Sequence, residues 1–136
     1  MGSSDGHVSI IICIGSNEPD ATIRVRRAID LLGTTFDIAG TSDPYPTVPA
    51  PPAPADGAPY ANAVVRCRTS LLPDEITARL KQYEKTLGRC PEHKSEGRVV
   101  IDLDLVVYGD VVCRKSEFQS DYFQQGYMKL SEKSHR

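Results

Sequence analysis

The amino-acid sequence predicts an α+β fold in which two helices pack on one face of an antiparallel sheet. Segments rich in β-branched residues alternate with segments of helical period in the order β, α, β, β, α, β. A chain with this order forms a split βαβ sheet, with both helices on one face and the other face open to ligands. The length of 136 residues predicts a single domain over 1–136, with a core over about residues 8–130.

The first half of the chain supplies a buried strand, a helix and a second strand. Residues 8–14 are β-branched and almost wholly apolar, which is typical of a strand covered on both faces. Helical spacing of apolar residues begins at about residue 21, after Asp20 as the expected N-cap, and ends before Gly33. Residues 36–45 are β-prone and form the second expected strand.

A proline-rich loop is expected over residues 44–59, which hold seven of the ten prolines. Each proline removes a backbone hydrogen-bond donor, so this segment has polyproline character. An inert linker is one interpretation. We favour a functional loop, because long loops inside compact domains are commonly lids or binding loops.

The second half supplies a strand, a helix and a charged loop. Residues 60–69 alternate between a polar face and a face of small and apolar side chains. Pro73 is expected at the start of the next helix and Gly88 at its end. A charged loop over 89–98 follows, and beyond the last strand we expect a short returning strand and a frayed C-terminal end.

The segment 99–107 is the most informative strand. Its odd-numbered residues are uniformly apolar and form the expected core face, so Asp102 and Asp104 project together from the opposite face. Carboxylates whose Cα atoms lie about 6 to 7 Å apart can converge on one ion, and hard oxygen ligands suit Mg²⁺. A solvated strand face is the alternative interpretation.

Basic side chains stand just before this strand, at Arg89, His93, Lys94 and Arg98. Metal ligands with nearby cations are typical of phosphoryl transfer, where charge on the transferred group must be neutralised. No P-loop motif is present. A loop that only keeps the protein in solution is the alternative.

Composition argues against several classes of partner. Sixteen basic and 18 acidic residues give a net charge of −2, so no overall field attracts a nucleic acid or an anionic membrane. The apolar run over residues 10–14 is too short to span a bilayer, and no basic leader segment precedes it. The four cysteines form no C-x-x-C pair, so we expect reduced thiols and a cytoplasmic protein. We also expect the protein to be a monomer that binds small molecules.

Four motifs occur in order along residues 8–109. They are Ile14-Gly15-Ser16-Asn17, Tyr60-Ala61-Asn62-Ala63-Val64-Val65, Glu84 with Leu87-Gly88-Arg89, and Ile101-Asp102-Leu103-Asp104-Leu105 with Tyr108-Gly109. In these motifs and their spacing the chain resembles the 6-hydroxymethyl-7,8-dihydropterin pyrophosphokinase family of folate synthesis.

The resemblance implies a ferredoxin-like domain that transfers the β,γ-diphosphoryl group of ATP to the hydroxymethyl group of the pterin and releases AMP. It implies two Mg²⁺ ions, held with ATP by Asp102 and Asp104. Together with the basic loop, the expected catalytic residues are Asp102, Asp104, Arg89 and Arg98. The expected nucleotide-binding residues are Glu84, Arg89, Lys94 and Tyr122. The expected pterin-binding residues are Thr47, Val48, Tyr60, Asn62 and Tyr127.

The chain departs from the family pattern where cations are expected. Gly97-Arg98-Val99 stands where the family usually has Gly-Pro-Arg, and Asp121 and Gln125 replace a histidine and an arginine. These departures bear on catalytic rate more than on fold. A divergent member that binds Mg-nucleotide or a pterin-like ligand, with little or no activity, is therefore the alternative, and a purely structural interaction domain is a third possibility.

Overall fold

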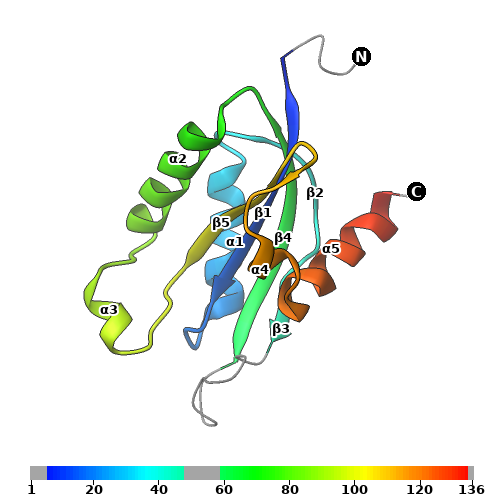
Figure 1. The fold of residues 1–136 in the computed structure, drawn as a ribbon. Helices are drawn as coiled ribbons and strands as arrows, with labels where there is room; N and C mark the ends of the chain where they lie inside the picture. Colours follow the sequence, from blue (N-terminus) through cyan, green and yellow to red (C-terminus); the bar gives the residue numbers. More distant parts are fainter. Residues whose placement is uncertain (1–5, 48–58, 135–136) are drawn as a thin grey trace.

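A six-stranded antiparallel sheet forms the centre of the protein (Figure 1). The structure is a computed structural model that describes residues 6–47 and 59–134. The strand order is β2-β4-β1-β5-β6, and β3 pairs with β4 beside this path. The strands are β1 (Val8–Ser16), β2 (Asp37–Thr41), β3 (Tyr45–Thr47), β4 (Tyr60–Thr69), β5 (Asp102–Tyr108) and β6 (Val111–Val112).

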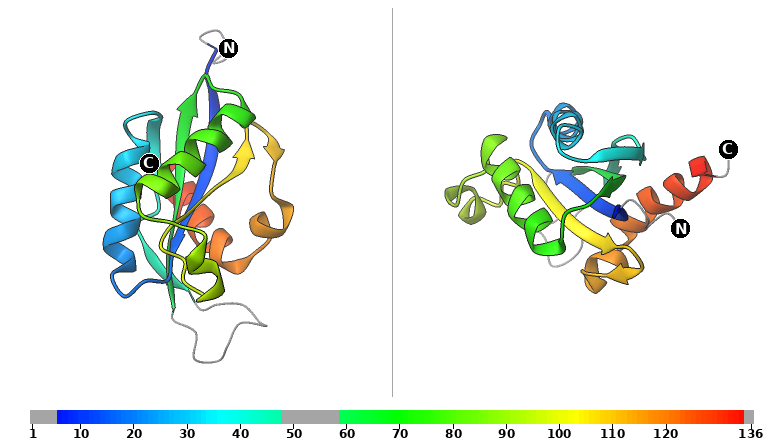
Figure 2. Two further views of the ribbon diagram at one scale, coloured as in Figure 1. Left: turned by 90° about the vertical axis from the view of Figure 1, so that its left-hand side faces the viewer. Right: turned by 90° about the horizontal axis from the view of Figure 1, so that it is seen from above.

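Helices lie on both faces of the sheet. They are α1 (Ala21–Leu32), α2 (Pro73–Thr86), α3 (Glu92–Ser95), α4 (Lys115–Phe118) and α5 (Asp121–Ser134). The view from above in Figure 2 shows α1 and α2 on one side of the sheet and α4 and α5 on the other. The predicted α+β ferredoxin-like class is confirmed, with α1 and α2 on one face. No helix among the described residues has the length and apolar character needed to cross a bilayer.

The larger core lies between the sheet and the pair α1 and α2. Ile10, Ile12 and Ile14 of β1 point into it, whereas Ile11 and Cys13 point to the opposite face, because successive side chains of a strand alternate. All five side chains are buried. The central strand predicted from this apolar run is therefore covered on both faces.

The opposite face was expected to be open, and this expectation was wrong for the part beneath α5. Phe123 and Leu130 of α5 pack with Ile11, Cys13 and Val64 in a second buried cluster. The helix α5 extends to Ser134, so it includes most of the charged end that was expected to be frayed. It docks because its apolar residues at positions 123, 127 and 130 share one helical face.

The strand expected over 99–107 begins later, at Asp102. The backbone of Val99 pairs with Asn17 instead of with a neighbouring strand. The Val99 N–H donates to Asn17 Oδ1 at 2.7 Å, and the Val99 carbonyl accepts the backbone N–H of Asn17 at 2.9 Å. A register shift between β1 and β5 also turns Val107 into the second cluster, so its side chain leaves the face on which simple alternation placed it.

Two loop positions differ from the expectations. Residues 45–47, assigned to the proline-rich loop, form β3 against β4, while residues 48–58 lie outside the described residues. Asp20 precedes α1 as predicted, but its side chain makes no capping hydrogen bond. It accepts instead from Arg24 Nε at 2.6 Å.

Candidate active site

Asn62, Gly15 and Asp102 lie in one row across three strands. Gly15 of β1 pairs with Asn62 of β4 on one side and with Asp102 of β5 on the other. A Cβ at residue 15 would lie 2.7 Å from Asn62 Nδ2, so this position requires the close approach that glycine allows. The row places an amide and a carboxylate on either side of a residue without a side chain.

The Asn62 amide is held at both ends. Its Nδ2 donates to the carbonyl of Ile14 at 3.2 Å, and its Oδ1 accepts from the hydroxyl of Thr47. Asn62 is buried, and Thr47 is paired with Tyr60 in the β3–β4 ladder. The structure therefore brings together Thr47, Tyr60 and Asn62, three of the five residues predicted to bind the pterin, while Val48 lies outside the described residues.

Asp102 and Asp104 project from the same face of β5, as their alternation predicts. The side chain of Asp102 is 40% exposed, whereas that of Asp104 is 17% exposed. Burial raises the pKa of Asp104 to about 9, and the neighbouring carboxylates of Asp102 and Glu117 act in the same direction. The ionised form of Asp104 is therefore unfavourable until a cation approaches.

Arg89 is fixed beside Asp102 by the way α2 ends. Gly88 has a φ of +104°, and the N–H of Arg89 donates to the carbonyl of Glu84 at 2.9 Å, which completes a Schellman-type cap. The Arg89 guanidinium then lies 3.0 Å from Asp102 Oδ1 and 3.1 Å from Glu84 Oε2. Burial alone would lower the pKa of Arg89, but Glu84 and Asp102 raise it, so the group stays charged.

Glu84 lies buried in the wall beside Arg89. Its Oε2 accepts the backbone N–H of Leu103 at 2.8 Å as well as the Arg89 guanidinium. Burial raises the pKa of Glu84, and the hydrogen bond from Leu103 and the charge of Arg89 oppose this. Glu84, predicted to bind nucleotide, thus joins α2 to β5 and positions Arg89.

A cationic cavity of about 600 Å³ opens between α2, α3 and the end of β4. Its lining includes Lys81, Lys85, Arg89 and Arg98, with Tyr60 at its border. Lys81 and Lys85 were missed by the sequence analysis. The signal was present, because Lys81 and Lys85 are four residues apart, the spacing of a single helix face, shortly before Arg89.

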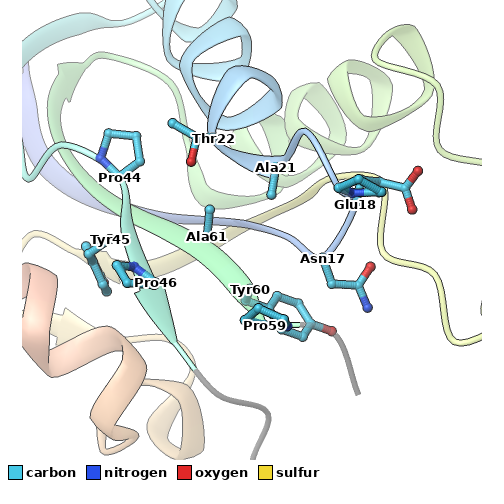
Figure 3. Close-up of a pocket in the computed structure, with 11 residues that line it drawn as sticks. Asn17, Glu18, Ala21, Thr22, Pro44, Tyr45, Pro46, Pro59, Tyr60 and Ala61 are labelled. Atoms are coloured by element: carbon cyan, nitrogen blue, oxygen red, sulfur yellow. The ribbon is translucent and has the colours of Figure 1, made fainter. Parts of the chain in front are cut away.

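A second cavity, of about 440 Å³, lies on the other side of Tyr60 (Figure 3). The segment Asn17–Thr22 forms one wall, and Pro44, Pro46 and Pro59 contribute to the others. Burial and the charge of Asp102 raise the pKa of Tyr60, so its phenol stays protonated. Tyr60 therefore offers a ring and a hydroxyl donor between the two cavities.

Arg98, predicted to be catalytic, lines the cationic cavity and is paired with two acidic side chains. Its guanidinium pairs with Glu18 at 2.9 Å and with Glu96 at 3.5 Å, at the edge of the cationic cavity. Asn17 Nδ2 donates to the carbonyl of Gly97 at 2.9 Å. These bonds, with those between Asn17 and Val99, fasten the end of the 89–98 loop to the β1–α1 turn. Lys94, another predicted residue, falls within α3.

Tyr122 and Tyr127 lie on α5, outside the row formed by Asn62, Gly15 and Asp102. The carbonyl of Tyr122 accepts the Tyr45 hydroxyl at 2.5 Å, and burial raises the pKa of the Tyr122 phenol. The Tyr127 ring packs with Phe123 and Phe118, at centroid distances of 5.4 and 5.6 Å. Both tyrosines therefore contribute to the second buried cluster, on the face of the sheet that also carries Asn62.

Arg114 is a charged neighbour of the aspartate pair that the sequence analysis missed. Its Nε lies 2.7 Å from Glu117 Oε1 and 3.9 Å from Asp104 Oδ1. Glu117 is buried on α4, a helix that was not predicted. Arginines thus flank the pair on both sides, Arg89 at Asp102 and Arg114 at Asp104.

The aspartate pair fits a hard cation that arrives with its own ligands. Among the residues described, no three His, Cys, Asp or Glu side chains are grouped so that they could hold a metal by themselves. Two carboxylates suffice for Mg²⁺ when a phosphate and water supply the other oxygens. The unfavourable ionisation of Asp104 is a second sign, because a bound cation would relieve it.

The fold and the site define a class: an α+β protein whose aspartate pair stands beside a cationic cavity, an arrangement suited to a phosphorylated ligand. The family model described as 7,8-dihydro-6-hydroxymethylpterin-pyrophosphokinase (HPPK) matches residues 11–131. The chain belongs to this family, as the sequence motifs predicted.

Two relatives show how much of each protein is shared. The chain is 34% identical over 106 residues to the mitochondrial folate synthesis bifunctional protein of Pisum sativum, covering 77% of this chain and 20% of that protein. It is 30% identical over 106 residues to 2-amino-4-hydroxy-6-hydroxymethyldihydropteridine pyrophosphokinase of Aquifex aeolicus (strain VF5), covering 78% and 64%. The chain thus matches less than two thirds of the length of either relative.

Proposed function

We propose that this protein transfers a diphosphoryl group from ATP to 6-hydroxymethyl-7,8-dihydropterin and releases AMP. One observation carries the proposal: Asn62 and Asp102 lie in one row across Gly15, with Arg89 fixed at Asp102. An amide suited to a heterocycle thus stands beside a carboxylate and a cation suited to a phosphate. Membership of the family supports the same activity.

The pterin is assigned to Tyr60, Asn62 and Thr47. A flat heteroaromatic ring stacks favourably on a phenol ring, and its edge carries both donors and acceptors. After its bonds to Ile14 and Thr47, the Asn62 amide keeps one N–H and one oxygen lone pair for a ligand. Because the amide is already oriented, it pairs with the heterocycle without a further loss of rotamer freedom.

The nucleotide phosphates are assigned to the cationic cavity. Lys81, Lys85 and Arg89 line it, and Glu84 holds Arg89 in place, so charge is available without a rearrangement. Asp102 and Asp104 would hold Mg²⁺ with ATP, two ions by the family resemblance. When bound, Mg²⁺ neutralises phosphate charge and aligns the reacting oxygens.

A divergent member with little or no transfer activity is the alternative, and the position of Arg98 favours it. Glu18 already neutralises the charge of Arg98, which would otherwise be available to the phosphates. Such a protein would still bind Mg-nucleotide or a pterin-like ligand through the residues above. Binding without turnover therefore separates the two functions.

The decisive experiment incubates the protein with ATP, Mg²⁺ and the pterin, and separates AMP and the diphosphorylated pterin by chromatography. We expect Asp102→Ala and Asp104→Ala to abolish turnover. We expect Asn62→Ala to weaken the binding of the pterin by about 1 to 3 kcal/mol and to change the binding of the nucleotide little. Asp110→Ala is the matched control, because Asp110 is exposed in the β5–β6 turn. Binding of a Mg-ATP analogue without AMP would support the alternative, and absence of both would refute the proposal.

The oligomeric state and the compartment stay predictions. We expect a monomer and a cytoplasmic location. Sedimentation of the purified protein and fractionation of the source cells check the two expectations.

A further inference from the structure

Cys90 and His93 form a side-chain pair in the wall of the cationic cavity. The Cys90 Sγ lies 3.3 Å from His93 Nε2, and both residues are partly exposed. Both line the cavity together with Arg89 and Arg98. The function proposed above uses neither side chain.

The surroundings of His93 favour one tautomer. Within the described part of the chain, His93 Nδ1 is buried and has no hydrogen-bond partner. A buried N–H without an acceptor is costly, so the proton belongs on Nε2, which then donates to the Cys90 sulfur. This contact fixes the sulfur in the wall of the cavity, where a reagent that enters the cavity meets it.

The charges around the cavity act mainly in the same direction. Lys81, Lys85 and Arg89 line the cavity and attract anionic reagents. Glu92 opposes them: it accepts a hydrogen bond from the Cys90 thiol, which lowers the pKa of Glu92 after the effect of its own backbone N–H. Glu92 is exposed, and so are Lys81, Lys85 and Arg89, so solvent screens all of these charges.

The other cysteines differ from Cys90 in ways that make them internal standards. Cys13 and Cys67 are buried, and burial raises the pKa of both thiols, that of Cys67 to about 12. Cys113 is exposed, and its Sγ lies 3.9 Å from the carbonyl of Val111. The rate at which Cys113 reacts therefore shows how reactive an exposed thiol outside the cavity is.

We propose that Cys90 is a thiol-modification site that takes a small anionic disulfide, such as glutathione disulfide, into the cationic cavity. The Cys90 thiol loses its proton to solvent, and the thiolate attacks one sulfur of the disulfide. The reagent S–S bond breaks, a new S–S bond joins Cys90 to one half, and the other half leaves as a thiolate that takes up a proton. The attached group fills the cavity, and a free thiol reverses the reaction.

The first test measures which cysteine reacts, using the reduced protein and dithiobis(nitrobenzoate) as the anionic disulfide. We expect peptide mapping to show Cys90 modified at least about threefold faster than Cys113. A neutral disulfide, hydroxyethyl disulfide, should reduce this preference, as should high salt. Equal or faster reaction of Cys113 would overturn the proposal, and this comparison requires no variant.

Two variants test the assigned neighbours. We expect His93→Gln to slow the reaction of Cys90 towards that of Cys113, because the contact that fixes the sulfur in the cavity wall is lost. We expect Glu92→Gln to accelerate it, because a carboxylate facing the thiolate is removed. An unchanged rate in His93→Gln, with the protein folded by circular dichroism, would overturn the proposal.

The last test connects the thiol to the cavity. Inorganic pyrophosphate, used alone as an anion that fits this space, should slow the modification of Cys90 but not that of Cys113. Equal rates with and without pyrophosphate would place the reaction outside the cavity and overturn the proposal. None of these measurements depends on transferase activity, so failure of the proposed function would leave their outcome interpretable.

Discussion

Gly15 and Asn62 face each other across β1 and β4, and the Asn62 amide lies where a side chain at residue 15 would begin. The amide lies close enough for its Nδ2 to donate to the carbonyl of Ile14 at 3.2 Å. Glycine is therefore needed at this point of the strand for packing, and the orientation of the proposed pterin-binding amide depends on it.

We predict that Gly15→Ala destabilises the protein by about 1 to 3 kcal/mol and weakens pterin binding, because its Cβ would displace the Asn62 amide. Urea unfolding and calorimetric titration measure the two effects. Gly40→Ala is the control, since a Cβ there meets Leu130 Cδ2 at an ordinary 3.6 Å. Equal losses of stability and of pterin binding in the two variants would show that replacing any glycine in a strand has this effect, and that the contact with Asn62 adds nothing.

Asp104 should make stability depend on pH. Its pKa is raised from 3.8 to about 9 by burial and by Asp102, so between these values the folded protein binds more protons than the unfolded chain. Stability from this group is full below about pH 4 and is lost as pH rises towards 9. We predict that the free energy of unfolding of Asp104→Asn is larger than that of the wild type by at least about 1 kcal/mol at pH 8, and equal to it near pH 4.

Denaturant midpoints across this pH range test the prediction, and added Mg²⁺ should recover the stability of the wild type at pH 8 but not that of Asp104→Asn. Parallel curves for the two proteins from pH 4 to 9 would show that Asp104 ionises normally.

Arg114 should stabilise the acidic residues around it. We predict that Arg114→Gln costs about 1 to 3 kcal/mol at neutral pH, because the buried Glu117 carboxylate loses its nearby cation. Lys115→Gln, one residue away and exposed, is the control. A double-mutant cycle with Glu117→Gln isolates the pair, and a coupling energy near zero would contradict the assignment.

Gly126 should govern how α5 docks on the sheet. A Cβ there would lie 2.5 Å from both the Tyr45 hydroxyl and Val64 Cγ2. We predict that Gly126→Ala destabilises the protein by about 1 to 3 kcal/mol, despite the better helix propensity of alanine. Gln125→Ala, on the exposed side of the same helix, should be neutral or stabilising, and similar losses for both would argue against tight docking of α5.

The strands and helices that pack on the main core could be predicted because their periods are clear. Residues 8–14 and 60–69 carry uninterrupted β patterns, and α2 has Pro73 and Gly88 at its ends. The docking of α5 was missed because its glycine and polar residues are weak helix signals, although its apolar residues share a helical face. Tertiary packing against Val64 decides that segment.

The aspartate pair could also be predicted, because alternation along one strand places both side chains on one face. The partners of these and other charges could not. Arg98 pairs with Glu18 at a separation of 80 residues, and Arg114 reaches Asp104 from the position just before α4, a short helix that has no periodic signal. Loop geometry fixes such pairs, and sequence periodicity carries no information on it.

The segment between Arg89 and Gly97 is fastened at both ends, by the cap of α2 and by the bonds from Asn17 to Gly97 and Val99. Its ends are therefore set by α2 and by the β1–α1 turn rather than by its own residues. Doubling the length of a loop between fixed ends costs only about 0.6 kcal/mol in closure entropy. The loop between these two fixed ends can thus be replaced by loops of other sequence or length. Such a replacement would alter which anions enter the cavity while Asp102 keeps its place.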